Sequence, residues 1–419
     1  MDLVFAVISD THIKGSCSAE HEKLKRALIY INSIESDLDA LIVAGDITNM
    51  GTKKSFEGFV KIFKSCMKEE SQKILVMGNH DYLGSFTVRG AQKKFVKTTG
   101  EDIHSHKIIK GFHFISLSTE GKKIKGVYGK KLLGWLKKHL KEAHADDFQK
   151  PIFITLHHNI KGTVYGSDYW GNDKLYEIIK EYPQAVVFSG HSHHPVKDER
   201  AIHQRDFTAV SAGSTSYVQL EGKGLIGGIP YNAGEFSQGL MVNVKNNCVS
   251  LSVLDFEKNV SHRDKWIIEE AANKKKFLYT DERNLYRNRP YFGRSSSVKI
   301  IERGSNHIKI EFTQGRHQDF VHSYVIRVID KRKEKLIKET KIFSDYYSKY
   351  QSSQLQFSQK YLMPGREYVI LVNAVESFGM ESEDFLSVSF KTKGIFNKEM
   401  FASMFLVGKY FNLRYNINI

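Results

Sequence analysis

The chain contains little cysteine and little proline, with three cysteines and six prolines among 419 residues. Cys17, Cys66 and Cys248 lie far apart and form no CxxC pair, so neither a disulfide framework nor a thiolate zinc site is indicated. No apolar run approaches the roughly 20 residues that a membrane-spanning helix needs. The opening stretch MDLVFAVIS also lacks the basic start and the cleavage site of a signal peptide.

The remaining composition is that of a globular protein with an excess of positive charge. Hydrophobic residues make up 41% and charged residues 26% of the chain, and the length allows two or three domains. The net charge of +15 favours an anionic partner, such as a phosphate substrate, nucleic acid or an anionic cell envelope. The lysines between 130 and 141 share a predicted helix with a leucine face, a pattern typical of a helix surface that faces water.

Short apolar runs recur in the first half of the chain, at 3–9, 40–45, 73–78, 112–117, 151–156 and 185–190. Stretches with apolar residues three and four apart lie between several of them, at 18–35, 54–68 and 129–143. Apolar strands that alternate with helices predict a layered α/β domain with a largely buried sheet. Strands without helices follow from about 206 to 256, so we expect this domain to span 1–256.

The second half of the chain has a different pattern. Residues 257–295 are charged and irregular and are expected to form a connector, and 296–392 read as short alternating strands. The stretch LMPGREYVILVNAV resembles the fibronectin type III sandwich, a small all-β domain. The resemblance assigns Tyr368 a hydrogen bond across a corner of that fold. Such a domain is expected to serve adhesion, spacing or homo-oligomer contact. Residues 393–419 form a tail of unknown structure.

Polar side chains follow five of the apolar runs, at the point where each predicted strand ends. The five blocks are Asp10-Thr11-His12, Gly45-Asp46, Gly78-Asn79-His80-Asp81, His157-His158 and Gly190-His191-Ser192-His193. A turn accounts for any one block, but turns do not require Asp, Asn or His after every strand. In layered α/β sheets, ligand sites gather beyond the carboxyl ends of the strands. Oxygen and nitrogen ligands of these types bind divalent metals, so the pattern predicts a metal site.

The order D-x-H, GD, GNHD, HH, GHxH resembles the calcineurin-like metallophosphoesterase superfamily over roughly 1–256. Within it, the sequence is most similar to the branch of class III cyclic-nucleotide phosphodiesterases and purple-acid-phosphatase-like enzymes. Many members of that branch read His-His-Pro-Pro where this chain has His157 to Ile160, so the wall beside the site is expected to differ. The resemblance implies an α/β fold in which a β-sandwich is flanked by helices.

The resemblance also implies a site for two metal ions, divalent or of mixed valence, with Mn, Fe and Zn as candidates. Carried over residue by residue, the first ion would be held by Asp10, His12 and His193. The second would be held by Asn79, His157 and His191, and Asp46 would bridge the two. His80 would donate a proton or stabilise the transition state, and Asp81 would orient His80 through a hydrogen bond. His158 is expected to have a supporting role.

Two metal ions about 3.5–4 Å apart acidify a shared water, and the resulting hydroxide attacks phosphorus in line. We therefore expect a phosphodiesterase that acts on cyclic nucleotides or other small diesters. A dianionic monoester usually needs more positive charge, and no Arg lies within the five blocks. A phosphomonoesterase or a nucleotide pyrophosphohydrolase is the alternative. A non-catalytic scaffold would be expected to have lost metal ligands, yet all seven are present. A nuclease would be expected to have a stripe of aromatic and basic residues beside the site, and the sequence shows none.

Three features stay open at the level of sequence. Tyr165, Tyr169 and Trp170, in the loop after His158, can stack on a base or pack the loop onto the domain. His104 and His106 form a further HxH without partner groups nearby in the sequence and are expected to be structural. The missing signal peptide indicates the cytoplasm, whereas a mature or truncated chain with a fibronectin-like module would fit an extracellular setting.

Overall fold

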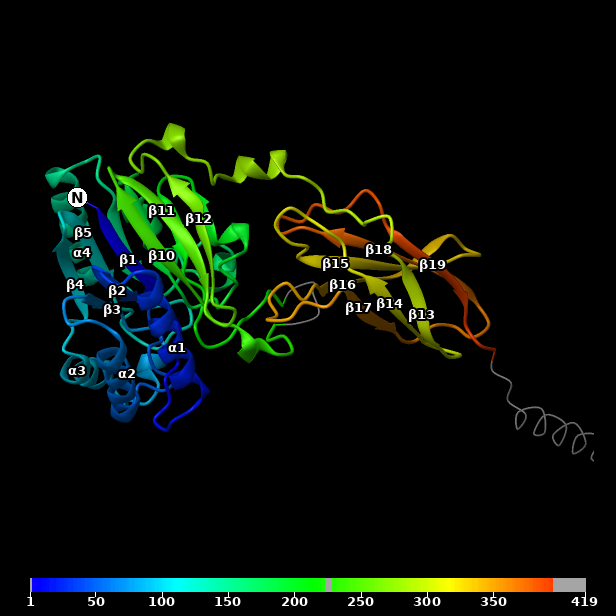
Figure 1. Cartoon of the computed structure of the whole chain (residues 1–419), viewed down its shortest axis with the longest axis horizontal. Helices are drawn as coiled ribbons and strands as arrows, with labels where there is room; N and C mark the ends of the chain where they lie inside the picture. The colour runs from blue at the N-terminus through cyan, green and yellow to red at the C-terminus, as the bar shows by residue number, and fades with distance from the viewer. Residues whose placement is uncertain (1, 223–227, 395–419) are drawn as a thin grey trace, which may run out of the picture. The chain divides into compact units, whose positions relative to one another are not determined.

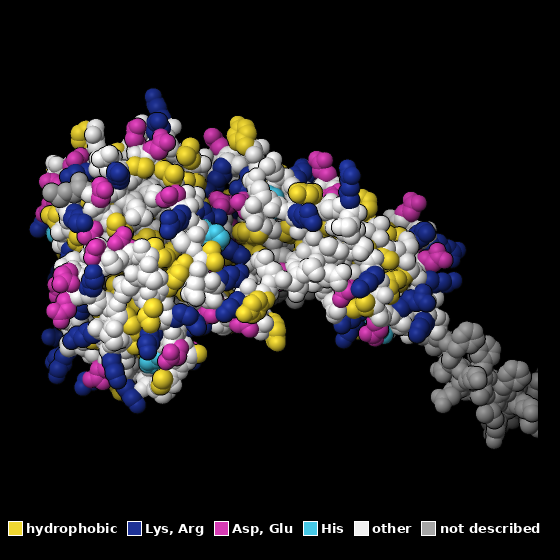
Figure 2. Space-filling view, in the orientation of Figure 1, with side chains coloured by type: hydrophobic (Ala, Val, Ile, Leu, Met, Phe, Trp, Pro, Cys, Tyr) yellow, Lys and Arg dark blue, Asp and Glu magenta, His cyan; other side chains and the backbone are white. Residues whose placement is uncertain are grey.

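The computed structural model describes residues 2–222 and 228–394, which form two compact units (Figure 1). The first unit consists of the chain up to Asn288 together with Asp345–Gln351, and the second begins at Arg289. No helix among the described residues combines the length and the apolar character needed to cross a membrane. Over the face drawn in Figure 2, Lys and Arg side chains are scattered among Asp and Glu rather than gathered in one basic patch.

The first unit contains two six-stranded sheets. The first sheet has the order β12-β11-β10-β1-β2-β3, with β1 (Leu3–Ile8), β2 (Ala40–Val43), β3 (Gln72–Leu75), β10 (Gln238–Lys245), β11 (Cys248–Asp255) and β12 (Val260–Ile268). The second has the order β4-β5-β6-β7-β9-β8, with β4 (His104–Ile109), β5 (Phe112–Leu117), β6 (Ile152–Leu156), β7 (Ala185–Ser189), β8 (Ile202–Gln204) and β9 (Thr208–Ser211). The helices are α1 (Ala19–Ile34), α2 (Lys53–Cys66), α3 (Val88–Thr99), α4 (Lys130–Asp146), α5 (Ser167–Trp170) and α6 (Tyr176–Ile179).

The two sheets pack face to face around aromatic side chains. The ring of Phe5 on β1 lies edge-on to Phe114, Phe153 and Phe188 of the second sheet, with centroid distances of 5.2, 4.9 and 5.8 Å. Helices α1, α2 and α3 pack on the first sheet and α4 packs on the second, each through its apolar face. The structure therefore confirms the predicted β-sandwich flanked by helices.

Parallel pairing brings the strand ends to common edges. Strand β1 pairs with β2 in parallel and β2 with β3, so that Ile8, Val43 and Leu75 lie side by side. Strands β5, β6, β7 and β9 are likewise parallel. The loops that follow are joined directly, since Asp10 N donates to Gly45 O and His12 N to Asp46 O, both at 3.0 Å. This arrangement gathers the polar blocks.

The stretch 257–295 differs from the expected connector. It begins with β12, which pairs with β11 and extends the first sheet. The sequence VSHRDKWII does not predict this strand, because only Trp266 and Ile268 of β12 are buried and most other residues face solvent. The first unit accordingly continues to Asn288 rather than ending near 256.

The second unit is all-β. Its three-stranded sheet comprises β13 (Val298–Arg303), β14 (Ile308–Thr313) and β17 (Gln354–Gln359), and its four-stranded sheet comprises β16 (Lys335–Phe343), β15 (Ser323–Asp330), β18 (Glu367–Val375) and β19 (Leu386–Lys391). The buried Tyr368 accepts a hydrogen bond on its hydroxyl from Met363 N at 3.0 Å, the corner contact that the resemblance assigned to it. Of the predicted tail, residues 395–419 lie outside the described residues.

Substitution of Tyr368 by Phe should destabilise the second unit by about 1 kcal/mol, because Met363 N loses its acceptor. For a unit of this size, that change lowers the melting temperature by about 4–8 °C. Differential scanning calorimetry of the full chain measures the shift. Tyr361→Phe is the control, because Tyr361 is 91% exposed. Equal melting temperatures for Tyr368→Phe and the wild type would contradict the role of this bond.

Candidate metal centre

Five of the seven predicted metal ligands have a left-handed backbone. The φ angles are 54° for Asp10, 46° for His12, 45° for Asp46, 71° for His191 and 53° for His193. Residues other than glycine seldom adopt positive φ, and such strain persists where the surrounding structure enforces it, often at functional sites. Here the parallel strands and the bonds between loops enforce it.

The first predicted ligand group converges on one point. Nε2 of His193 lies 3.0 Å from Oδ1 of Asp10, and Nε2 of His12 lies 3.2 Å from the same His193 atom and 3.7 Å from Asp10 Oδ1. All three side chains are buried. A carboxylate and two imidazoles thus share one small volume, a donor set that suits a divalent transition metal.

Asp46 lies between the two predicted groups. Its Oδ2 is 3.9 Å from His12 Nε2 and 3.3 Å from His157 Nε2, while its Oδ1 accepts a hydrogen bond from the backbone N–H of His80 at 2.8 Å. The carboxylate of Asp46 therefore faces one ligand of each group, as a bridging residue must.

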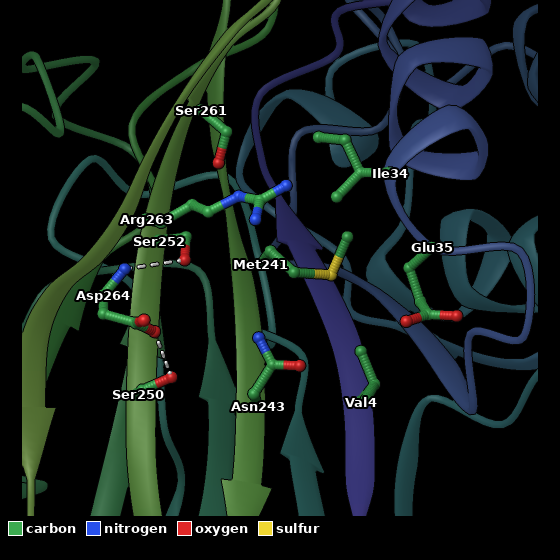
Figure 3. Close-up of a pocket in the computed structure, with 10 residues that line it drawn as sticks. All are labelled: Val4, Ile34, Glu35, Met241, Asn243, Ser250, Ser252, Ser261, Arg263 and Asp264. Carbon is green, nitrogen blue, oxygen red and sulfur yellow. Dashed lines mark hydrogen bonds between the residues drawn. The ribbon is translucent and has the colours of Figure 1, made fainter.

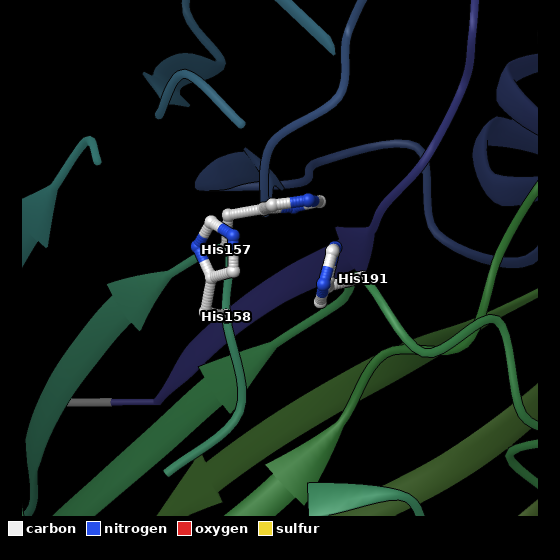
Figure 4. A group of neighbouring side chains, drawn as sticks. All are labelled: His157, His158 and His191. Atoms are coloured by element: carbon white, nitrogen blue, oxygen red, sulfur yellow. The ribbon is translucent and has the colours of Figure 1, made fainter. Parts of the chain in front are cut away.

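The second group surrounds His157 and His191. Figure 4 shows the rings of His157, His158 and His191, whose ligand atoms lie within 4.8 Å of one another. The backbone N–H of His191 donates to Asp10 Oδ2 at 2.9 Å, which ties this loop to the first group. His158 is fully buried against His191, with ring centroids 4.4 Å apart. The structure thus brings His158 closer to the centre than its expected supporting role requires.

Two ligand atoms of the second group have no polar contact within the described part of the chain. Asn79 Oδ1 and His191 Nε2 are buried and accept no hydrogen bond there. A buried polar atom without a partner costs about 1–3 kcal/mol, so such atoms indicate a missing ligand. The described residues therefore fit the divalent metal ions that the sequence pattern predicts.

Backbone carbonyls fix the direction of two imidazoles. Nδ1 of His157 donates to Ala44 O at 2.8 Å and Nδ1 of His193 to Tyr217 O at 3.0 Å. Because a carbonyl only accepts, Nδ1 carries a proton in both rings, and Nε2 is the nitrogen that points toward the centre and could bind an ion. This is the usual support for histidines that bind metal through Nε2.

The electrostatics of the centre favour positive charge. Burial alone would raise the pKa of Asp46, but the neighbouring His157 and His12 lower it to about 2. Burial lowers the pKa of His157, but Asp46 and Asp10 outweigh this and raise it to about 9. Two buried carboxylates thus attract a cation, which the imidazolium of His157 supplies and a metal ion would supply.

Glycine at two positions permits the close approach of the loops. A Cβ atom added to Gly78 would lie 2.1 Å from Asp46 Oδ1. One added to Gly190 would lie 1.8 Å from Ser9 Oγ, which donates to Asp10 Oδ2 at 2.6 Å. Any larger residue at either place would displace a carboxylate.

Asp81 does not orient His80, contrary to expectation. Its carboxylate accepts hydrogen bonds from the backbone N–H groups of Ile47, Thr48 and Gly78 and from the Thr48 hydroxyl, at 2.7–3.2 Å. His80 Nδ1 instead donates to Asn49 O at 3.0 Å. Asp81 therefore joins the loops that carry Asp46 and Asn79, a role that depends on backbone groups and has no sequence signature.

Aromatic residues cover the edge of the centre. The ring of Tyr217, from the stretch SAGSTSY, lies 4.2 Å from that of His193, and Trp170 lies edge-on to His191 at 5.8 Å. The carbonyl of Tyr217 also orients His193. Trp170 thus lies at the site.

The other two aromatic residues of the loop are elsewhere. Tyr165 stacks on His194 at 4.1 Å and packs under the guanidinium of Arg200 at 3.6 Å, whereas Tyr169 is 52% exposed. Of the three predicted aromatic residues, Tyr165 therefore packs the loop onto the unit.

The comparison with known families agrees with this geometry. The family model for calcineurin-like phosphoesterases matches residues 3–195, which include all seven predicted ligands. Residues 3–195 belong to the calcineurin-like phosphoesterase family. The chain is accordingly a hydrolase that acts on phosphoester bonds, and its family implies divalent metal ions.

Two curated relatives each match just under half of this phosphoesterase. The probable glycerophosphodiester phosphodiesterase GpdQ of Arcobacter nitrofigilis is 26% identical over 208 residues, 46% of this chain and 72% of the relative. The probable cyclic nucleotide phosphodiesterase of Ruthia magnifica subsp. Calyptogena magnifica is 29% identical over 207 residues, 47% and 80% of the two chains. Purple acid phosphatase PPD1 from yellow lupin (Lupinus luteus) seeds matches with a TM-score of 0.47 and 12% identity, covering 69% of this chain and 55% of that one.

A separate pocket of the phosphoesterase lies away from these residues. Figure 3 shows it between α1 and strands β1, β10, β11 and β12, with a volume of about 350 Å³ and Arg263 reaching into it. None of the seven predicted ligands lines it. Its position along the strands, rather than at their carboxyl ends, distinguishes it from the candidate centre.

Replacement of Asp81 by Ala should lower the free energy of unfolding of the first unit by at least about 2 kcal/mol, because three buried backbone donors lose their acceptor. Urea unfolding followed by tryptophan fluorescence reports on this unit alone, since Trp135, Trp170 and Trp266 all belong to it. Asp37→Ala, at an exposed ion pair, should change little. Lost activity with unchanged stability would support the orienting role instead.

Proposed function

We propose that the chain is a binuclear metal-dependent phosphodiesterase that hydrolyses small phosphodiesters such as cyclic nucleotides. The observation that carries this proposal is the position of Asp46 Oδ2, which faces His12 Nε2 at 3.9 Å and His157 Nε2 at 3.3 Å. One carboxylate between two sets of ligands is the arrangement that two adjacent metal ions require.

We propose the same division of the ligands that the sequence predicts. Asp10, His12 and His193 would hold one ion, and Asn79, His157 and His191 the other, with Asp46 shared. When bound, the ions would supply an acidified water and positive charge for the phosphate. The donor set lacks thiolate and suits Mn, Fe or Zn. The contribution of the chain is a rigid set of bare Nε2 and carboxylate atoms, held by strained loops and carbonyl contacts.

His80 is placed to handle a proton. Its side chain is 33% exposed, at the solvent side of the centre, and its Nε2 lies 4.0 Å from Asp46 Oδ2. Because Nδ1 donates to Asn49 O, Nε2 is the nitrogen that faces a bound substrate. A protonated His80 would give its Nε2 proton to the leaving oxygen, which makes it the general acid of the proposed reaction.

Charge favours a diester as substrate. Lys14, which follows the first block, is paired with Glu20 Oε1 at 2.7 Å, so its charge is largely neutralised. Arg200 is likewise held by Asp198. A monoester carries two negative charges and would gain from a free cation near the site, whereas a diester carries one. The names of the two curated relatives, both phosphodiesterases, support the same choice.

Two features of the second unit support a fibronectin type III-like assignment. These are its three-stranded and four-stranded antiparallel sheets and the hydrogen bond from Met363 N to the Tyr368 hydroxyl. We propose that it serves as a spacing or contact module of the enzyme, through homo-oligomer or anionic cell-envelope contacts.

Hydrolysis of bis-p-nitrophenyl phosphate should exceed that of p-nitrophenyl phosphate, require added Mn²⁺ and stop with chelator. Asn79→Ala should lower kcat/KM by about 10²-fold or more, since a lost ligand removes several kcal/mol of charge stabilisation. Asn243→Ala, in the pocket of Figure 3, is the matched control. A preference for the monoester would identify a phosphatase. No turnover with metal bound would identify a scaffold.

Replacement of His80 by Ala should lower kcat about 10²–10⁴-fold for a diester with an alkoxide leaving group, such as a cyclic nucleotide. The loss should be much smaller with p-nitrophenolate, which leaves without a proton. Steady-state kinetics on both substrates measure the difference. His307→Ala is the control, with a side chain 36% exposed in the second unit. Equal losses on both substrates would exclude proton donation.

A further inference from the structure

A second group of histidines lies where α4 packs against the edge strand β4 and its neighbour β5. Its members are His106 on β4, His113 on β5, and His139, Glu142 and Asp146 on α4. None belongs to the candidate centre. We propose that His106, His139 and Glu142 bind a further divalent transition-metal ion of the zinc type.

The three ligand atoms are close enough to share one ion. His106 Nδ1 and His139 Nδ1 are 2.9 Å apart, and His139 Nδ1 is 2.7 Å from Glu142 Oε2. All three lie within 4.8 Å of one another. Ligand nitrogens of a tetrahedral zinc ion lie about 3.3 Å apart at a metal–nitrogen distance of about 2.0 Å. The site needs only a small expansion to accept an ion.

A chain of hydrogen bonds fixes which nitrogen of His106 is bare. Asp146 Oδ2 can only accept, so His113 carries its proton on Nε2, 3.2 Å away. His113 Nδ1 is then an acceptor and accepts a hydrogen bond from the N–H of His106 Nε2 at 2.7 Å. His106 Nδ1 is left without a proton and points at His139. A histidine whose other nitrogen is held in this way is the usual form of a metal ligand.

His139 and Glu142 are also held in place. They lie three residues apart on α4 and so share one face of the helix. The ring of Trp135 lies against His139 with centroids 4.4 Å apart. The His139 side chain is 18% exposed and that of Glu142 is 47% exposed, so an ion can reach the site from solvent and retain a water as its fourth ligand.

The charge state of the group suits a metal. Burial, together with His113 and His139, lowers the pKa of His106 to about 4, so this imidazole is neutral at physiological pH. Metal binding to His106 therefore releases no proton from that ring, and the ion displaces only the proton of His139 Nδ1. The ion would join α4 to β4, two elements that are separated by more than 20 residues, and would therefore stabilise the outer edge of the second sheet.

The test measures zinc content of the metal-free full chain after equilibrium dialysis against Zn²⁺. The wild type should bind one more zinc per chain than the double variant His106→Ala/His139→Ala. His104→Ala, on the same strand, should retain the wild-type content. Glu142→Gln should lose the same zinc. Because Glu142 is exposed, this variant controls for a loss of zinc that is caused by misfolding of the double variant.

The candidate centre provides an independent comparison. Asn79→Ala should affect zinc bound at the centre and leave the zinc that depends on His106 in place. His113→Ala should weaken that zinc about 10–100-fold, because it removes the support of His106 Nε2. Equal zinc content in the wild type, the double variant and Glu142→Gln would overturn the proposal, whatever the phosphodiesterase assays give.

Discussion

The structure depends on the burial of two carboxylates, Asp10 and Asp46, at the ends of neighbouring parallel strands. Each is almost fully removed from water, and burial of an unpaired charge is expensive. Positive charge must therefore lie beside them, and the imidazolium of His157 supplies it. The need to hold these opposed groups within a few ångströms explains why the surrounding loops have left-handed backbones and why glycines precede Asp46, Asn79 and His191.

The sandwich supplies the rigidity that this arrangement requires. Strands β1, β2, β6 and β7 are buried along almost their whole length, and their apolar side chains pack on both faces. The loop conformations are unfavourable by themselves and persist because the strands before them cannot move. Asp81 also holds these loops in place, since its one carboxylate accepts hydrogen bonds from backbone N–H groups of two loops.

The sequence could predict those parts of the fold and site that are local. Continuous apolar runs identify the central strands, and each proposed ligand directly follows such a run. Strands β4 and β12 could not be predicted because they lie at the edges of their sheets, where polar residues such as His104 and Arg263 interrupt the apolar pattern. The contacts of Asp81 could not be predicted for another reason, because its partners Ile47 and Thr48 are 34 and 33 residues away and use backbone groups.

The two histidine groups of the first unit differ in what an ion does for them. At the candidate centre, Asn79 Oδ1 and His191 Nε2 are buried without a partner, and the carboxylates are sealed from water. At the α4 edge, every nitrogen that faces the group has a partner, and Glu142 and Asp146 reach solvent. An ion at the centre satisfies atoms that nothing else in the described chain satisfies. An ion at the edge replaces a shared proton in a network that is already complete. The first group therefore fits a resident metal ion. The ion proposed for the second group would exchange with the solvent.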